Sequence, residues 1–246
     1  MELPLISCKT ITYGRVEMLE EALYSFLQQD YSNKEMVIVN DYPLQKLKFE
    51  HPNVRIFNMD ETFETIGDKE NFATKQCKGD IICQWDDDDV ALPNHLNNVH
   101  KYFVPNTSVL HWKKGVYYNT PKITSIEWIG NSGIVFGKQA WEKIGGHPIE
   151  NAGYDMTFVQ KLHKLGGVVF ADPPREEVSW FYMWGGRGYH MSGLGDDKPG
   201  QMNVIKRHSE FVESLRRGGK IPTGDIELKP NWKYDYSQML KDFVAR

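Results

Sequence analysis

Short apolar runs and longer amphipathic segments alternate along the chain. Over residues 16–27 and 154–165 apolar side chains recur every three or four positions, which is the period of one face of a helix. The runs at Lys34–Val39 and just before Asp86 are short and compact, as expected for buried strands. A strand, helix, strand order predicts a right-handed crossover in a parallel sheet. We therefore expect an α/β fold with a mostly parallel central sheet flanked by helices.

The same criteria predict the other elements of the chain. The helix over residues 154–165 is expected to turn Phe158, Leu162 and Leu165 inward. We divide the chain into a domain over residues 1–195 and a helical extension over residues 196–246 that packs on it. Further helices are predicted over Gly67–Cys77, Asn94–Phe103 and Ala140–Ile144, strands over Leu3–Cys8, Val54–Phe57, Thr107–Trp112 and Val168–Ala171, and a hairpin within Gly115–Trp128.

The composition is that of a globular protein with an ordinary core. The chain has 246 residues, 40% of them hydrophobic, and a net charge of -4, which argues against coating nucleic acid by charge alone. Three cysteines without a CxxC spacing fit a reducing cytoplasm. The N-terminus lacks the pattern of a signal peptide, and no apolar run is long enough to span a bilayer. We therefore expect a cytoplasmic protein without a transmembrane segment.

Four consecutive carboxylates, Asp86 to Asp89, follow the strand that begins after Gly79. Neighbouring like charges repel one another, and a divalent cation such as Mg²⁺ or Mn²⁺ would relieve that repulsion. In an extended chain Asp86 and Asp88 would lie on one side and Asp87 and Asp89 on the other, so that Asp86 and Asp88 share the metal. The alternative is an acidic surface turn that caps the helix after Pro93, and for Asp89 alone both interpretations stay open.

Polar side chains also follow the first two predicted strands. Thr12, Tyr13 and Arg15 come after the first strand, and Asp41 comes directly after the second. Ligands of open α/β sheets bind beyond the carboxyl ends of the strands, where the aspartate run also lies. The sequence therefore predicts one nucleotide site at this edge of the sheet.

Three later features have both a functional and a structural interpretation. Asp155 begins a helix and either complements the helix dipole or acts in catalysis. The aromatic and glycine-rich stretch over residues 180–193 suggests a mobile loop that closes over a ligand, with Arg187 on a phosphate and His190 on a metal. His190 is otherwise an ordinary polar residue. A basic helix predicted over Lys206–Lys220 is by default a solvated face, with a patch for an anionic acceptor as the alternative.

Taken in order, these motifs resemble those of glycosyltransferase family 2, which has the GT-A fold, a Rossmann-like sheet that binds nucleotide-sugars. The resemblance covers roughly residues 3–193, and Lys69 stands near the place of an arginine of the family. The motifs that carry the resemblance are Ile11-Thr12-Tyr13-Gly14-Arg15, Val37-Ile38-Val39-Asn40-Asp41, Asp86-Asp87-Asp88-Asp89, Gly145-Gly146 with Tyr154-Asp155, and Tyr189-His190-Met191-Ser192.

The resemblance implies a metal-dependent, inverting glycosyltransferase that uses a nucleoside-diphosphate sugar, with UDP favoured. It implies nucleotide contacts from Thr12, Tyr13, Arg15, Asp41, Lys69, Asp86, Asp87 and Arg187, a Mn²⁺ or Mg²⁺ ion on Asp88, Asp86 and His190, and a catalytic base in Asp155. The acceptor stays open between a saccharide, a protein and a modified base in DNA. The alternatives are a nucleotide-sugar-binding domain without turnover and, ranked well below, a nucleotidyltransferase.

Overall fold

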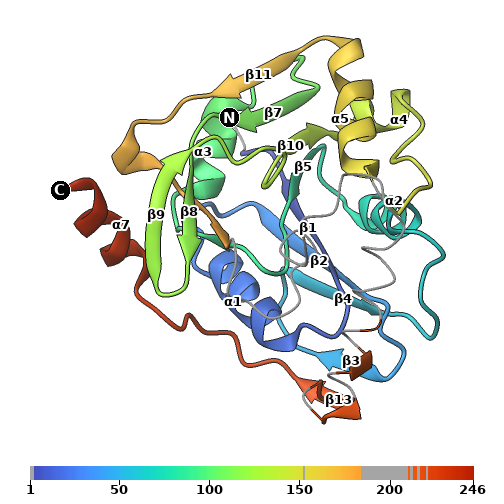
Figure 1. Ribbon diagram of the computed structural model, residues 1–246. Coiled ribbons are helices and arrows are strands. Elements are labelled where there is room, and N and C mark those ends of the chain that lie inside the picture. Colours follow the sequence, from blue (N-terminus) through green and yellow to red (C-terminus); the bar gives the residue numbers. More distant parts are fainter. Residues whose placement is uncertain (1–2, 152, 184–209, 211–212, 215–216, 220) are drawn as a thin grey trace.

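The computed structural model describes residues 3–151, 153–183, 210, 213–214, 217–219 and 221–246 (Figure 1). Its centre is a seven-stranded sheet with the strand order β11-β7-β10-β5-β1-β2-β4, in which β10 alone runs antiparallel to its neighbours. The predicted α/β fold with a mostly parallel sheet is therefore confirmed. The strands of this sheet are β1 (Ile6–Thr12), β2 (Lys34–Asn40), β4 (Val54–Asn58), β5 (Ile81–Gln84), β7 (Val109–Trp112), β10 (Val135–Gly137) and β11 (Val168–Ala171).

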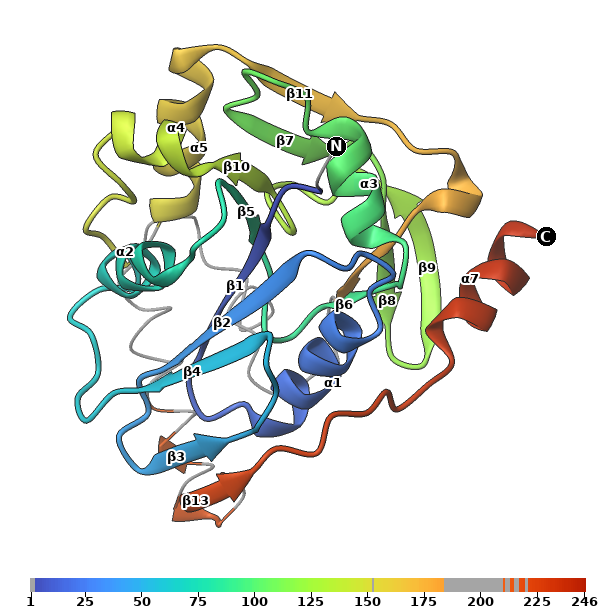
Figure 2. The same ribbon diagram turned by 180° about the vertical axis from the view of Figure 1, so that it is seen from behind.

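Helices cover both faces of this sheet (Figures 1 and 2). Alternate residues of β2 point to opposite faces, so Met36 and Ile38 pack with α1 and α3 while Val37 and Val39 pack with α2 and α5. Burial on both faces explains why this strand is apolar throughout. The helices are α1 (Val16–Leu27), α2 (Ile66–Gln76), α3 (His95–Tyr102), α4 (Lys138–Lys143) and α5 (Tyr154–Leu165).

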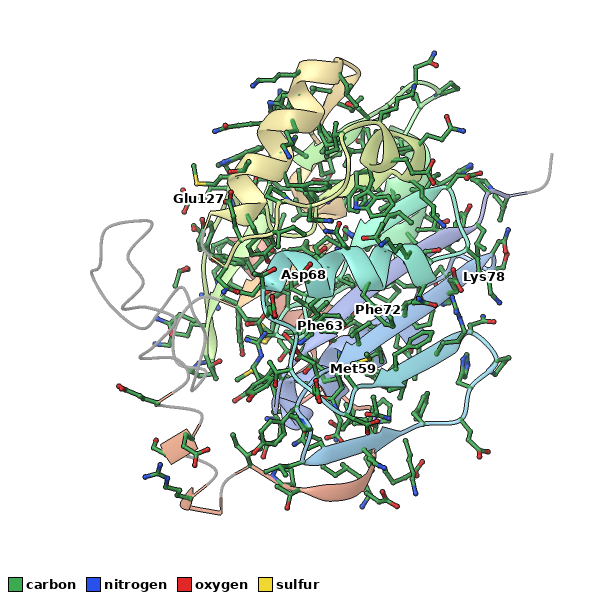
Figure 3. The ribbon with its side chains drawn as sticks, turned by 90° about the vertical axis from the view of Figure 1, so that its right-hand side faces the viewer. Met59, Phe63, Asp68, Phe72, Lys78 and Glu127 are labelled. Atoms are coloured by element: carbon green, nitrogen blue, oxygen red, sulfur yellow. The ribbon has the colours of Figure 1, made fainter. Side chains whose placement is uncertain are left out.

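Helix α2 is fixed both at its start and along its side. The Thr65 hydroxyl caps it by accepting from the Asp68 amide at 3.0 Å. Along its length, Phe72 contacts Phe63 and Phe57 with ring centroids 5.5 and 5.7 Å apart, and Figure 3 shows Phe72 and Phe63 next to Met59. These contacts tie α2 to the loop after β4 and so fix the side chains that α2 presents to the carboxyl edge of the sheet.

Two smaller sheets complete the fold. The predicted hairpin is β8 (Gly115–Asn119) and β9 (Lys122–Glu127), and it joins β6 (Val90–Ala91) and β12 (Trp180–Met183) in the order β6-β12-β8-β9. Near the C-terminus, β13 (Gly224–Glu227) pairs in parallel with β3 (Gln45–Lys48), and α7 (Tyr236–Val244) packs beside β12 and the hairpin. The last segment of the chain thus runs along the outside of both sheets (Figure 2).

Three expectations about the elements were wrong. The first strand spans Ile6–Thr12 and not Leu3–Cys8, because Lys9 is neutralised by Glu70 and can stay buried in the sheet. Residues 180–183 form a buried strand and not a loop, since Trp180 and Phe181 pack in the core; residues 184–193 lie outside the described residues. Leu165 ends its helix at the surface and is exposed, whereas Phe158 and Leu162 point inward as predicted.

Of the other expectations, some are confirmed and some concern residues outside the described ranges. Cys8 and Cys83 are free, buried thiols, which is the common case for cysteines in strands, and Cys77 is free and buried as well. Most of the helix predicted over Lys206–Lys220 falls outside the described residues. In the part of the chain that the structure describes, no helix has the length and apolar character needed to cross a membrane.

Candidate active site

The carboxyl edge of the main sheet is hollowed into a cavity of about 1020 Å³. Loops after β1, β2 and β5 line it together with the first turns of α2 and α5. Arg187 and His190 lie outside the described residues. The structure brings together the other predicted site residues around this cavity, namely Thr12, Tyr13, Arg15, Asp41, Lys69, Asp86, Asp87, Asp88 and Asp155.

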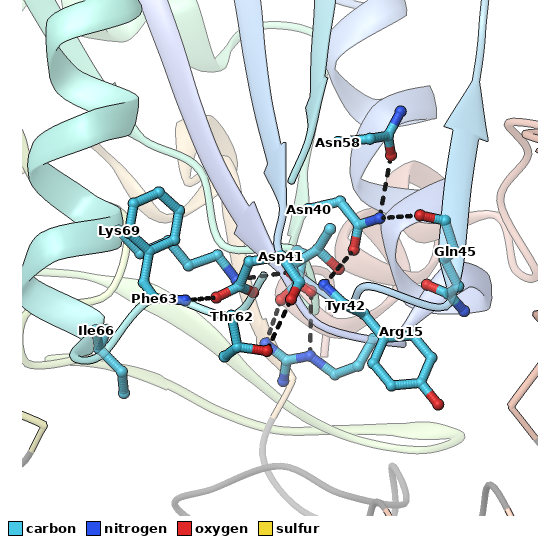
Figure 4. A network of polar contacts seen from close by, with 12 residues as sticks. Arg15, Asn40, Asp41, Tyr42, Gln45, Asn58, Thr62, Phe63, Ile66 and Lys69 are labelled. Atoms are coloured by element: carbon cyan, nitrogen blue, oxygen red, sulfur yellow. Dashed lines mark hydrogen bonds and ion pairs between the residues drawn. The ribbon is translucent and has the colours of Figure 1, made fainter. Parts of the chain in front are cut away.

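In the cavity Asp41 is held by one group of α2 and one group of the loop after β4 (Figure 4). Its carboxylate forms an ion pair with Lys69 and accepts the backbone N–H of Phe63 at 3.1 Å. The Lys69 ammonium also donates to the Thr12 carbonyl at 2.7 Å, which links α2 to the end of β1. Burial lowers the pKa of Lys69, and the charge of Asp41 opposes that shift. Lys69 therefore orients Asp41, a role that the sequence analysis did not foresee, since it expected Lys69 to contact the nucleotide.

Asn40 directly precedes Asp41 and shapes the turn that carries it. Its side-chain amide donates to the Gln45 carbonyl and to Asn58 Oδ1, both at 3.1 Å. Its side-chain oxygen accepts the Tyr42 amide at 3.2 Å (Figure 4). A residue that both donates and accepts is needed here, and an ionised aspartate only accepts.

The aspartate run forms a turn and does not continue as an extended strand. The Asp89 amide reaches the Asp86 carbonyl at 3.4 Å, so the expected alternation of the four side chains was wrong. Because of the turn, Asp87 and Asp88 face the same guanidinium: Arg15 Nε donates to Asp87 at 3.1 Å and Nη1 donates to Asp88 at 2.8 Å. Arg15 therefore pairs with two neighbouring carboxylates, and its single positive charge balances only one of their two negative charges.

Asp89 has a structural role. Its Oδ2 accepts the Ser132 hydroxyl at 2.6 Å and the Trp180 indole N–H at 3.0 Å, and its Oδ1 accepts the Met183 amide at 2.9 Å. Burial and the charge of Asp88 raise its pKa well above the usual range. These contacts join the aspartate turn to β12, so Asp89 is neither a helix cap nor placed like its three neighbours.

Asp86 lines the cavity in a buried and strongly acidic environment. Burial, and next the charge of Asp88, raise the pKa of Asp86 to about 7. Within the described residues, no group of three or more His, Cys, Asp or Glu side chains is arranged to hold a metal. The pair of Asp86 and Asp88 nevertheless suits Mg²⁺ or Mn²⁺, which prefer carboxylate oxygens and are usually held by one or two of them together with substrate phosphates.

A buried chain of contacts beneath Asp86 was missed in the sequence. Lys9 of β1 forms an ion pair with Glu70 of α2, and Glu70 Oε1 accepts the Gln84 amide at 3.3 Å. The same amide donates to Asp86 Oδ1 at 3.0 Å. Only one signal was present in the sequence, a lysine within an otherwise buried strand, and its partner lies 61 positions away.

Opposite the aspartate run, the start of α5 reaches the cavity. Gly153 precedes it with φ +71°, a left-handed conformation that glycine adopts without strain, and Tyr154 and Asp155 then line the cavity. Burial, followed by the charges of Glu70 and Asp155, raises the pKa of Tyr154 well above its usual value. Tyr154 therefore stays a neutral hydroxyl, and Asp155 is the carboxylate on this side.

His147 also lines the cavity, and the sequence analysis did not single it out. Asn71 clasps its backbone, accepting its N–H at 2.7 Å and donating to its carbonyl at 2.9 Å. Trp141 donates its indole N–H to His147 Nδ1 at 3.2 Å, and the ring stacks on Phe158 at 3.8 Å. Burial lowers the pKa of His147, so the ring is neutral and carries its proton on Nε2.

Known proteins share this architecture. S. aureus TarS 1-349 in complex with UDP-GlcNAc superposes with a TM-score of 0.63 at 16% identity, over 97% of this chain and 71% of that one. The mannosyltransferase PcManGT from Pyrobaculum calidifontis, in complex with GDP-Man and Mn²⁺, gives 0.57 at 16% identity, over 100% of this chain and 86% of that one. At this identity the likeness establishes the fold, which is GT-A.

Sequence comparison reaches further than the fold. An uncharacterized glycosyltransferase of Bacillus subtilis (strain 168), YwdF, is 32% identical over 101 residues, which span 39% of this chain and 37% of that protein. Residues 7–161, more than half of the chain, match the sequence profile of glycosyl transferase family 2 and include most of the cavity described above. On these grounds the chain belongs to glycosyl transferase family 2, and its match spans little more than a third of the curated relative's length.

Proposed function

We propose that this glycosyltransferase transfers a sugar from a UDP-sugar to an acceptor hydroxyl with inversion at the anomeric carbon and with a divalent cation, Mn²⁺ or Mg²⁺. One observation supports the proposal most: a single cavity combines a nucleotide end at Asp41, a carboxylate pair at Asp86 and Asp88, and a separate carboxylate at Asp155. Structural neighbours contain UDP-GlcNAc in one case and GDP-Man with Mn²⁺ in another.

The nucleotide end suits a base with polar edges. Asp41 is buried and oriented by Lys69 and the Phe63 amide, so its carboxylate is pre-organised to accept a hydrogen bond from a base N–H. Tyr13 lies beside it, with its ring in edge contact with Tyr42 at 4.9 Å, and offers an apolar surface to the base. Both features favour a uracil ring, which has an N–H between two carbonyls.

Asp86 and Asp88 are the residues that would hold the metal, and His190 is the proposed third ligand. When bound, the cation would neutralise the negative charge of the diphosphate as the bond between diphosphate and sugar breaks. Gln84 orients Asp86 and Arg15 orients Asp88, so both carboxylates are placed before the donor arrives. Arg187 is the proposed additional cation for the diphosphate.

Asp155 is the proposed general base. The acceptor oxygen forms its bond to the anomeric carbon on the face opposite the departing diphosphate, and Asp155 takes the hydroxyl proton. Its place on the first turn of α5, whose inner side is held by Phe158 and Leu162, keeps its backbone fixed. A neutral Tyr154 beside it adds a hydrogen-bonding hydroxyl without competing for the proton.

Asp155→Asn tests the proposal, because Asn keeps the size of the side chain and cannot take the proton. Transfer should fall by ~10²-fold or more, while the melting temperature and the UDP affinity stay near those of the wild type. Asp68→Asn is the matched control, since Asp68 is a first-turn carboxylate of α2 that does not line the cavity. Near-normal transfer by Asp155→Asn would remove Asp155 from the mechanism.

Asp88→Ala tests the metal. UDP binding measured by calorimetry should lose its dependence on Mn²⁺, because one of the two carboxylates proposed to hold the metal is gone. Unchanged metal dependence would overturn the metal site. Tight UDP binding by the wild type with no sugar release from any UDP-sugar would favour the rival interpretation of a binding domain without turnover.

A further inference from the structure

The order of strands in the sheet separates the two ends of the cavity. Asp41 follows β2 and Asp86 follows β5, so the nucleotide and the reacting sugar occupy the β2-β1-β5 part of the edge. Asp155 belongs to α5, which packs on β7 beyond β10. A hydroxyl that meets Asp155 therefore approaches from the side of β7, β11 and the β8-β9 hairpin (Figure 1).

Two large aromatic rings are exposed on that side. Trp128, just after β9, lines the cavity and is 44% exposed, and Phe170 of β11 is 48% exposed. Their ring centroids lie 6.0 Å apart, so Phe170 continues outward from the cavity wall that Trp128 forms. We name the rings of Trp128 and Phe170 the aromatic shelf. Two adjacent exposed rings at the rim of a site offer a ligand an apolar surface on which to stack.

The shelf is held rigidly from below. His111 of β7 is buried, stacks on Phe170 with centroids 5.3 Å apart, and lies 5.8 Å from the Trp128 ring. His111 Nε2 and His163 Nε2 of α5 are 2.9 Å apart, which ties the backing ring to the helix that carries Asp155. On the other side Tyr117 donates its hydroxyl to the Trp128 carbonyl at 3.2 Å. Rings fixed in this way lose little freedom when a ligand stacks on them.

The chemistry of the surroundings favours a carbohydrate over a nucleic acid. Among the described residues that line the cavity, the cationic ones are Arg15 and Lys69, and both are ion-paired with aspartates. A phosphate backbone needs cations along its path, and carboxylates such as Asp155 would repel it. Sugar rings instead present C–H faces that stack on aromatic rings and hydroxyls that bond to polar neighbours.

We propose that the acceptor is a carbohydrate chain, whose sugar residues stack on Trp128 and Phe170 so that the terminal hydroxyl reaches Asp155. This proposal rests on the proposed function, because it takes Asp155 as the base that the acceptor meets. It assigns to the shelf the role of selecting and orienting the acceptor, while Asp41 and Lys69 serve the donor.

Saturation-transfer NMR with the whole chain, UDP and Mg²⁺, which is diamagnetic, tests whether the shelf binds the acceptor. The probes are cellohexaose, maltohexaose, mannohexaose and chitohexaose. At least one should receive saturation at its C–H protons, and its Kd should rise about tenfold or more in Trp128→Ala and in Phe170→Ala. Tyr234→Ala is the matched control, because Tyr234 is an exposed aromatic residue outside the cavity lining.

Several outcomes would overturn the proposal that the aromatic shelf binds a carbohydrate acceptor. These are no binding of any of the four oligosaccharides to a wild type that binds UDP, equal Kd values in the shelf variants, and Trp128-dependent binding of a single-stranded DNA oligomer. So would a dimer, seen by light scattering, that Phe170→Ala dissociates, because the rings would then serve contact between copies. Calorimetry with UDP on the same preparation separates the two proposals. A wild type that does not bind UDP would contradict the proposed function, but it would not contradict carbohydrate binding by the aromatic shelf.

Discussion

The ion pair of Lys9 and Glu70 offers the sharpest test of how the site is built. Lys9 is 0% exposed and Glu70 1%, and no other described acidic side chain forms an ion pair with Lys9. Glu70 in turn holds the Gln84 amide that donates to Asp86 at 3.0 Å. Removing either charge should therefore affect both the stability of the fold and the placement of Asp86.

The expected magnitude follows from burial. Glu70→Gln leaves the Lys9 ammonium in the core without a counter-charge, which should cost about 3–5 kcal/mol of unfolding free energy. Lys9→Met should cost a similar amount, since Glu70 would then be buried beside Asp86 with no cation. The double variant Lys9→Met/Glu70→Leu removes both charges and should cost only about 1 kcal/mol, chiefly for the lost partner of Gln84.

Two measurements separate stability from function. Urea unfolding of the metal-free protein gives the free energies of both single variants and the double variant, and their non-additivity measures the coupling. Calorimetry then gives the Mn²⁺-dependent affinity for UDP, which should weaken about 10–100-fold in the double variant because Asp86 loses its orientation. Lys48→Met is the control, because it breaks the exposed Lys48–Asp225 ion pair and should barely change unfolding.

The reasoning fails if Glu70→Gln unfolds at the same urea concentration as the wild type. It also fails if the double variant is less stable than both single variants, because the cost would then come from packing and not from an uncompensated charge. A stable double variant with unchanged UDP affinity would show that the ion pair contributes to stability as described but does not help to place Asp86.

Two further predictions concern stability. Burial lowers the pKa of His95 to about 3, against about 6.5 in an unfolded chain. As pH falls, the unfolded state therefore binds a proton before the folded state does. The contribution of His95 to folding stability is complete above pH 6.5 and is lost as pH falls toward 3. Between about pH 7 and pH 5 the wild type should lose about 2 kcal/mol more unfolding free energy than His95→Gln, and parallel pH profiles in urea unfolding would contradict this. Gly146→Ala should lower the melting temperature more than Gly145→Ala: both sites have left-handed φ, which costs an alanine roughly 1–2 kcal/mol, but only at Gly146 would the new Cβ lie 2.6 Å from Asn71 Oδ1. Equal melting temperatures would mean that the Asn71 side chain moves away from the new Cβ at little cost in stability.

Local signals explain what the sequence could predict. Helix α5 has the predicted bounds, because its apolar period and the glycines at both ends are all within one short stretch. The gathering of Arg15, Asp41 and Asp86 around one cavity could be predicted too, since the carboxyl ends of parallel strands meet at one edge. Neither inference needs to know which distant residues pair.

What the sequence could not show depends on distant partners. Lys9 reads as the start of a loop until Glu70 is placed beside it, and that contact follows from α2 packing on β1. Strand β12 reads as part of an aromatic loop until it is seen between β6 and β8. The aromatic shelf combines Trp128, which follows β9, with Phe170 of β11, and their approach depends on the whole order of the sheets. Each of these features is a tertiary contact with no periodic trace in the chain.

The four consecutive aspartates suggested that a cation must relieve their repulsion. In the structure, groups of the protein itself already interact with several of the four carboxylates. Asp89 is stabilised by three donors from Ser132, Trp180 and Met183, and Asp87 by the Arg15 guanidinium. Asp88 shares Arg15, and Asp86 has the Gln84 amide as its described donor, with a pKa raised to about 7. The need for a cation is therefore greatest at Asp86 and next at Asp88, the two residues that we propose as metal ligands. Donors from the fold thus meet part of the charge of the run, and burial raises the pKa of Asp89 as well.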